Sequence, residues 1–183
     1  MTSIEVLRAV HHPTRRRIID FLGLNGPSRV GLLAGALDEQ VGSISHHLRM
    51  LERVGVVTQV RELATDGRTS WWRLDVRSLA WSVDDFADSP ADRAQAKAAE
   101  RVNIDHQLGR LSAWKRAADA APATWRRAAF TTDTTTKASA EELARLHELL
   151  EETLREWRAG IDLDDDQERE PVFVFAHGFP TAP

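Results

Sequence analysis

The fold is decided by residues 43–57, SISHHLRMLERVGVV, together with residues 66–74, DGRTSWWRL. In the first stretch the apolar residues Ile44, Leu48 and Leu51 recur at the spacing of one helix face, and Gly55 is a residue type that ends helices. Asp66 and Gly67 lie between two β-rich runs, which is a hairpin signal. The sequence therefore predicts a helix over residues 43–53 with one buried face, followed by a β-hairpin.

Three further helices are predicted upstream, over residues 4–10, 13–22 and 30–37. Pro13 suits the first position of the second helix, and residues 23–27 contain the Gly, Asn and Pro of a loop. Gly31 and Gly35 each cost the third helix about 1 kcal/mol relative to Ala. This helix is therefore marginal, or another backbone packs closely against it.

These residues resemble the ArsR (arsenical-resistance repressor) family of bacterial transcriptional regulators, which have a winged helix-turn-helix fold. The resemblance covers residues 4–79 and rests on four stretches in order: HPTRRRIIDFL (12–22), GPSRVGLLAGAL (26–37), SHHLRMLERVGVV (45–57) and the glycine-centred wing. Residues beyond 79, which end in HGFP, resemble an extension found in some of these regulators. The resemblance implies a dimeric repressor that binds a double-stranded DNA operator. The implied dimer interface comprises Ile4, Val6, Leu7, Val10 and a segment that starts at Leu79, Trp81 and Val83.

The candidate DNA contacts are donors and acceptors near the start of the helix over residues 43–53, because such side chains can read base edges in the major groove. Arginine can pair with guanine through two hydrogen bonds, and arginines on the wing or at a helix N-terminus can bind phosphate. The predicted DNA-binding residues are Ser43, Ser45, His46, Arg49, Arg68, Arg15, Arg16 and Arg61.

Alternatives stay open for several of these positions. A solvated helix face would also present polar residues, and His47 lies toward the buried side of the same helix. One arginine of the cluster at residues 15–17 can instead form an ion pair with Asp20 or Glu39. The family usually has polar side chains where this chain has Val41 and Gly42, so fewer base contacts are expected from the first turn.

Residues 80–183 are expected to form a second domain after a DNA-binding domain of residues 1–79. A helical linker is predicted over residues 90–121, and Ser139 with Glu142 forms a capping box that begins a helix over residues 140–159. Strands are predicted over residues 130–136 and 172–176, with an acidic loop at 161–170. The expected fold class is α+β: a mainly helical winged helix-turn-helix domain, the linker, and a small α+β module.

The second domain is also the expected place for an effector. An apolar pocket for a small organic ligand would be lined by Trp81, Trp114, Trp125 and Trp157. Tryptophans at helical spacing are more often core residues, so a packing or dimerisation module without a ligand is the alternative.

Composition narrows the signal that such a regulator could sense. The 183 residues include no Cys, which excludes thiolate metal sites and thiol redox sensing. The pairs Asp105 with His106 and His147 with Glu151 are too few ligands for a metal site, so no metal and no cofactor is expected. The expected signal is therefore a non-thiol one.

Charge and hydropathy place the chain in a compartment and suggest a partner. Residues 1–79 have 11 Lys and Arg against 8 Asp and Glu, a net charge of +3, whereas the remaining residues have 13 against 20, a net charge of −7. A basic N-terminal part is consistent with nucleic-acid binding. No apolar run approaches the ~18 residues of a membrane span, so a cytoplasmic protein without a membrane partner is expected.

The sequence thus predicts a sequence-specific transcriptional regulator. The alternative is a protein–protein adaptor in which the winged domain no longer binds specific DNA and the acidic C-terminal part binds a partner. An enzyme is not expected, because the chain has no nucleophile and base constellation, phosphate loop or nucleotide fingerprint.

Overall fold

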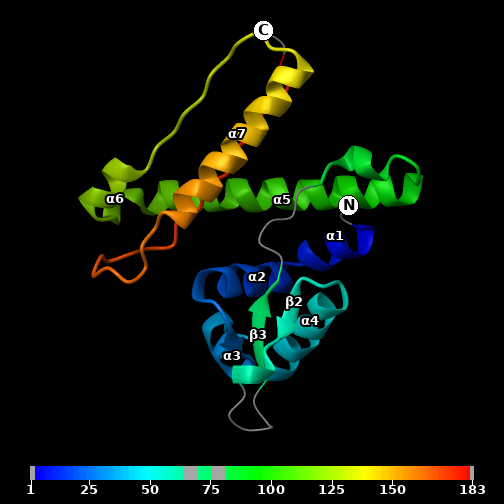
Figure 1. Cartoon of the computed structure of the whole chain (residues 1–183), viewed down its shortest axis with the longest axis vertical. Coiled ribbons are helices and arrows are strands. Elements are labelled where there is room, and N and C mark those ends of the chain that lie inside the picture. The colour runs from blue at the N-terminus through cyan, green and yellow to red at the C-terminus, as the bar shows by residue number, and fades with distance from the viewer. Residues whose placement is uncertain (1–2, 64–69, 76–80, 182–183) are drawn as a thin grey trace. The chain divides into compact units, whose positions relative to one another are not determined.

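The computed structural model describes residues 3–63, 70–75 and 81–181, and it contains two compact units, residues 1–113 and 114–183 (Figure 1). The predicted domain boundary at residue 79 remains a prediction. Arg68 and Leu79 lie outside the described residues. No helix in the described part of the chain combines the length and the apolar character that crossing a membrane requires.

Unit 1 contains the predicted series of helices and the hairpin. Its main elements are α1 (Ile4–Val10), α2 (Pro13–Asn25), β1 (Ser28–Arg29), α3 (Val30–Leu37), α4 (Val41–Arg53), β2 (Val57–Gln59), β3 (Trp71–Leu74) and the first part of α5 (Pro90–Ala117). Helix α2 continues through part of the predicted loop and ends at Gly26, whose positive φ of 71° suits glycine. Helix α4 begins two residues earlier than predicted, so Val41 and Gly42 belong to its first turn.

The connection between α3 and α4 is a tight turn over residues 38–40. Asp38 adopts the left-handed conformation with φ 53°, which Asp tolerates better than most residues, and the N–H of Glu39 bonds to the carbonyl oxygen of Ala34. Gln40 then precedes the first turn of α4. The two helices therefore form the helix-turn-helix that the sequence predicted.

The core of unit 1 is built on the inner face of α4. Ile44, Leu48 and Leu51 are fully buried, at 0% exposure, as their spacing predicted. They share one cluster with buried residues of α2, α3 and the sheet, namely Ile18, Leu22, Leu33, Val57 and Trp72. The position of α4 is therefore fixed by burial of one face, which leaves the opposite face to solvent.

The sheet has three antiparallel strands in the order β1-β3-β2. The predicted hairpin pairing is confirmed, with Val57 opposite Leu74 and Gln59 opposite Trp72. Strand β1 was not predicted; its two residues pair with Trp71 and Trp72 of β3. This pairing attaches the hairpin to the residues directly before α3.

Helix α1 is covered by α5 of the same chain. Leu7 is fully buried with Ala96 and Ala99, and Ile4, Trp81, Val83 and Phe86 pack around them. Val10 belongs instead to the core around α4. The residues expected at a dimer interface on α1 are thus partly used inside the chain, and Leu7 has no surface left for a partner.

Unit 2 contains the end of α5, a short helix α6 (Ala123–Ala128) and helix α7 (Ala140–Ala159). Helix α7 has the predicted bounds, and its capping box is present: the backbone N–H of Glu142 donates to the Ser139 hydroxyl, and the Glu142 carboxylate accepts from the Ser139 backbone. Its apolar positions are not buried; Leu149 and Trp157 are exposed.

The strands predicted over residues 130–136 and 172–176 are wrong. Neither segment is a strand in the structure, and residues 130–136 are exposed throughout. The β-rich composition of these segments does not suffice, because a strand needs a partner ladder and a buried face. The α+β class is therefore confirmed by the winged domain, and the described residues of unit 2 contribute helices alone.

Candidate nucleic-acid interface

The outer side of α4 carries the polar residues that the sequence singled out. His46 and Arg49 are exposed, and Ser43 and Ser45 are half-buried. Val41, Ser45 and Arg49 are four residues apart and share one side of the helix, whereas Ser43 lies on the other flank with His47. The structure thus brings Ser45, His46 and Arg49 together on one exposed surface.

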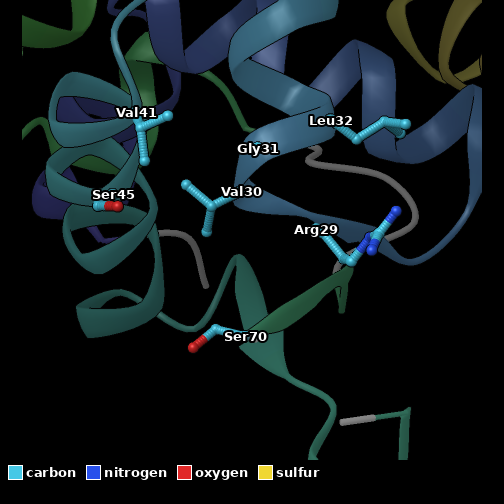
Figure 2. A pocket seen from close by; sticks show the side chains of 7 residues that line it. All are labelled: Arg29, Val30, Gly31, Leu32, Val41, Ser45 and Ser70. Carbon is cyan, nitrogen blue, oxygen red and sulfur yellow. The ribbon is translucent and has the colours of Figure 1, made fainter. Parts of the chain in front are cut away.

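A shallow hollow of about 610 Å³ lies beside this surface, between α4, α3 and the start of β3 (Figure 2). The residues that line it are Arg29, Val30, Gly31, Leu32, Val41, Ser45 and Ser70. Val41 and Val30 project toward each other from α4 and α3, and the hydroxyls of Ser45 and Ser70 border the same space. The described residues that line the hollow are apolar, hydroxylic or cationic, and none of them has a carboxylate.

Arg29 supplies the cation of this hollow. Its guanidinium lies over the Trp71 ring, 5.6 Å from the centroid, a cation–π contact between β1 and β3. The sequence did not identify Arg29, Val41 and Ser70 as neighbours of the exposed surface formed by Ser45, His46 and Arg49. A signal was available for Val41, because it lies four residues before Ser45, which lies four residues before Arg49, so the three share one side of the helix.

The arginine cluster at the start of α2 has partners inside the chain. Arg15 donates to the backbone oxygens of Arg8 (2.9 Å) and Ala9, and Arg17 pairs with Glu39 at 3.4 Å. The sequence left open that an arginine of this cluster forms an intramolecular ion pair. Arg17 forms such a pair, and so does Arg16. DNA contacts of Arg15 and Arg16 remain predictions.

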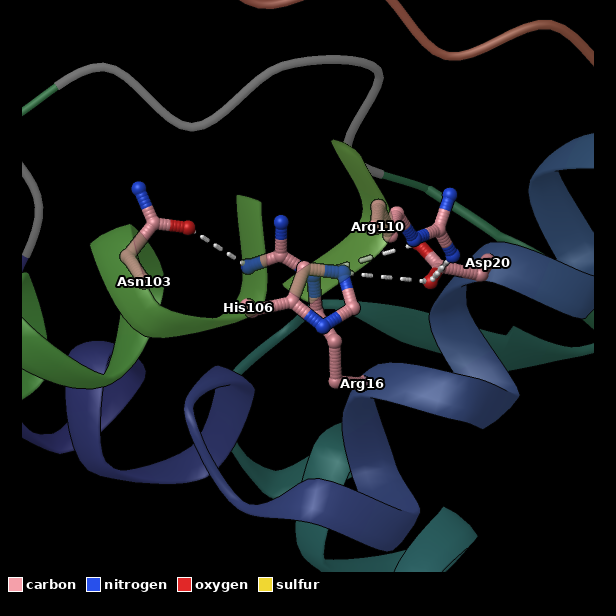
Figure 3. A network of polar contacts seen from close by, with 5 residues as sticks. All are labelled: Arg16, Asp20, Asn103, His106 and Arg110. Carbon is pink, nitrogen blue, oxygen red and sulfur yellow. Dashed lines mark hydrogen bonds and ion pairs between the residues drawn. The ribbon is translucent and has the colours of Figure 1, made fainter. Parts of the chain in front are cut away.

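Arg16 belongs to a network that joins α2 to α5 within unit 1 (Figure 3). Its guanidinium donates to the Asn103 side chain at 3.1 Å and lies 3.9 Å from the Asp20 carboxylate. The same carboxylate accepts a hydrogen bond of 2.5 Å from Arg110 and lies 3.9 Å from His106. Because Asp20 serves three cationic or titratable side chains, this network positions α2 against α5.

Histidines fill the junction between the start of α2 and its neighbours. The rings of His12 and His47 lie 4.8 Å apart, and the Nδ1 atoms of both are buried without a hydrogen-bond partner. Burial lowers the pKa of both residues, and Arg15 adds to the effect. His47 is therefore a packing residue between α4 and α2. Among the described residues, no group of three His, Asp or Glu is arranged to hold a metal ion.

His11 should make stability depend on pH. Burial, followed by Arg16 and His106, lowers its pKa from 6.5 to about 4 in the folded protein. Between these values the unfolded chain binds a proton that the folded chain does not, so the free energy of unfolding should fall as pH drops from about 6.5 to about 4. Urea unfolding at several pH values checks this.

The variant for this prediction is His11→Phe. It keeps a ring beside Trp81, whose centroid lies 5.6 Å from that of His11, and should make the pH dependence shallower. Equal slopes for His11→Phe and the parent would contradict the assignment.

The remaining predicted residues, Arg61 and Arg68, follow β2 in the chain. Arg61 is exposed in a 3₁₀ turn (Arg61–Leu63) after β2, rather than on the strand itself. The predicted tip of the wing, including Arg68, is outside the described residues.

The four tryptophans predicted to line an effector pocket are divided between the two units. Trp81 packs with α1 in unit 1, whereas Trp114, Trp125 and Trp157 belong to unit 2. None of the four lines the hollow beside α4.

Comparisons with known proteins found one family model and several similar solved structures. Residues 10–60 match the family model described as "Helix-turn-helix domain". One similar solved structure is a "possible transcriptional regulator for arsenical resistance", with 30% sequence identity over 60% of this chain and 94% of that chain and a TM-score of 0.34. HlyU from Vibrio cholerae has 22% identity over 57% of this chain and 88% of its own, with a TM-score of 0.35. A mutant of ZitR from Lactococcus lactis in apo form has 15% identity over 80% of this chain and 83% of its own, with a TM-score of 0.36. No curated protein matches the chain.

The matched segment contains the turn between α3 and α4, all of α4, and strands β1 and β2, and the third strand of the sheet, β3, follows it. A helix-turn-helix of this kind places its second helix in the major groove of DNA. Residues 10–60 are therefore a helix-turn-helix domain, with the added sheet of a winged one, and the chain is a DNA-binding transcriptional regulator.

Proposed function

We propose that this protein is a sequence-specific regulator that binds its operator as a homodimer and acts as a repressor. The observation that carries the proposal is the outer surface of α4, where Ser45, His46 and Arg49 lie together beside a hollow whose described lining residues include no carboxylate. A surface of donors on a helix that is held by its opposite face fits the major groove.

Each predicted residue has a role in this proposal. Arg49 pairs with guanine, and Ser43, Ser45 and His46 contact neighbouring base edges or phosphates. Arg61 and Arg68 bind phosphate on the wing side. Arg15 and Arg16 lie at the start of α2, and their main role is to hold that helix in position through intramolecular hydrogen bonds.

The dimer is supported by apolar surface on α5. Ile104, Leu108 and Leu111 recur at four and three residues on one side of the helix, and all are exposed. A two-fold axis along such a surface would present two copies of α4 to half-sites about 34 Å apart on a palindromic operator.

The proposed signal is a small organic ligand. The lack of Cys removes the thiolate metal sites that would otherwise be candidates. Trp114 and Trp125 are half-buried in unit 2 and offer aromatic surface to such a ligand. Ligand binding would lower operator affinity if it favoured a conformation in which the two recognition helices no longer match the major grooves.

The test is selection of duplexes from a random library with the full chain, followed by fluorescence anisotropy of an enriched duplex at two salt concentrations. The enriched duplex should bind at least about 10³-fold tighter than a scrambled one, weaken with salt, and carry two chains per duplex. Enrichment of no sequence would contradict the proposal and favour the adaptor alternative, with the acidic C-terminal part as its binding surface.

A further inference from the structure

We infer that the hollow beside α4 is a thymine subsite, in which Val41 contacts the C5-methyl group of one thymine of the operator. This inference rests on the proposed function and adds a specificity-determining residue to it. The residue lies outside the set that the polar pattern of α4 suggested.

Val41 is an apolar side chain at the first position of the recognition helix, and 56% of it is exposed. Since α4 already buries Ile44, Leu48 and Leu51 on its inner face, Val41 contributes little to the core. In the major groove only thymine presents a methyl group, and apolar side chains recognise it by contact. An exposed valine on a DNA-facing helix therefore suits thymine better than any other base.

The side chain one turn later completes the match. Ser45 lies four residues after Val41 on the same side of α4, and its hydroxyl borders the same hollow. Thymine presents its O4 acceptor next to the methyl group, so the Ser45 hydroxyl can donate to O4 while Val41 covers the methyl. A serine hydroxyl can also accept from cytosine, which makes the valine the discriminating member of the pair.

The surroundings leave room for the base and its backbone. A Cβ added at Gly31, which lines the hollow, would meet no described atom within 4 Å, so the rim is open at this position. Arg29 lies on this rim, held over Trp71, and none of the described lining residues has a carboxylate that would repel a phosphate. Duplex DNA is thus the occupant that the charge and the shape favour.

The experiment removes the apolar contact from each side in turn, first by removing the methyl group of thymine and then by shortening the Val41 side chain. In an enriched duplex, each thymine is replaced singly by deoxyuridine, which differs by that methyl alone. At one position per half-site the parent should lose about 4-fold in affinity, the effect of about one buried methylene-sized group. Val41→Ala loses the contact in both half-sites of the dimer, so it should bind the thymine duplex more weakly than the parent binds the singly substituted duplex, and it should no longer distinguish thymine from deoxyuridine at that position.

The control variant is Leu24→Ala, which removes an apolar side chain of similar exposure, 58%, at a residue that does not line the hollow. It should keep the parental ratio between thymine and deoxyuridine. Thermal unfolding of Val41→Ala should match that of the parent, since the valine is exposed.

The inference fails if no deoxyuridine substitution weakens the parent, or if Val41→Ala keeps the parental ratio. Either result can occur with a selected duplex that binds tightly, in which case the proposed function stands without a thymine subsite. Enrichment of no duplex would instead overturn the proposed function, and the subsite with it.

Discussion

Leu48→Ala should lower the free energy of unfolding by about 2–5 kcal/mol, the usual cost of emptying a buried leucine site. Leu48 is completely buried on the inner face of α4 and belongs to the cluster that includes Leu22, Leu33 and Trp72. A cavity there removes contacts to α2, α3 and the sheet at once. Urea unfolding, followed by circular dichroism and tryptophan fluorescence, measures the change.

DNA affinity should fall in the same variant, because α4 would no longer be held in one position. Adding the selected duplex should recover part of the lost stability, since a ligand that binds the folded state stabilises it. A change within about 0.5 kcal/mol, the range of ordinary surface substitutions, would show that α4 does not pack as described.

Arg49→Ala, at the next residue, should have the opposite profile. Its side chain is exposed, so the free energy of unfolding should stay within about 0.5 kcal/mol of the parent. Binding to the selected duplex should weaken by about 1–3 kcal/mol, and the preference for guanine at one position per half-site should relax. Anisotropy with a duplex set that carries each base at each position measures both effects.

Arg68→Ala is the comparison variant for Arg49→Ala. As a phosphate contact, Arg68 should contribute equally to all sequences, so its loss should weaken every duplex alike and reduce the salt slope by about one. If Arg49→Ala instead weakened all duplexes equally and left base preference intact, Arg49 would be a phosphate contact, and the proposal that it pairs with guanine would be wrong.

Helices α1 to α4 could be predicted from sequence because each buries apolar residues at helical spacing, and α7 could be predicted from its capping box and apolar periodicity. Ile44, Leu48 and Leu51 give α4 its core, and Ser139 with Glu142 gives α7 its first turn. The first residue of α4 was harder to predict. Asp38 is a residue type that often caps the N-terminus of a helix, yet here it ends α3 in the left-handed conformation, and Gln40 precedes the new helix. Its first turn therefore includes Val41 and Gly42.

Features that depend on distant pairing could not be predicted. Strand β1 has two residues and exists because Trp71 and Trp72 lie beside it. The threonine-rich segment over residues 130–136 has strand composition but no partner. For the same reason the sequence predicted the polar residues on α4 alone. It did not predict the hollow, which forms only where α3, α4 and β3 come together.

The burial of Leu7 beneath Ala96 and Ala99 has a consequence for biosynthesis. Helix α1 leaves the ribosome before α5, and the helix that covers it follows only after the whole winged domain has been made. At ordinary elongation rates this interval is on the order of ten seconds. Throughout it Leu7 is open to a chaperone or to a neighbouring nascent chain, so α1 is fully covered only after helices that follow it in the chain have folded.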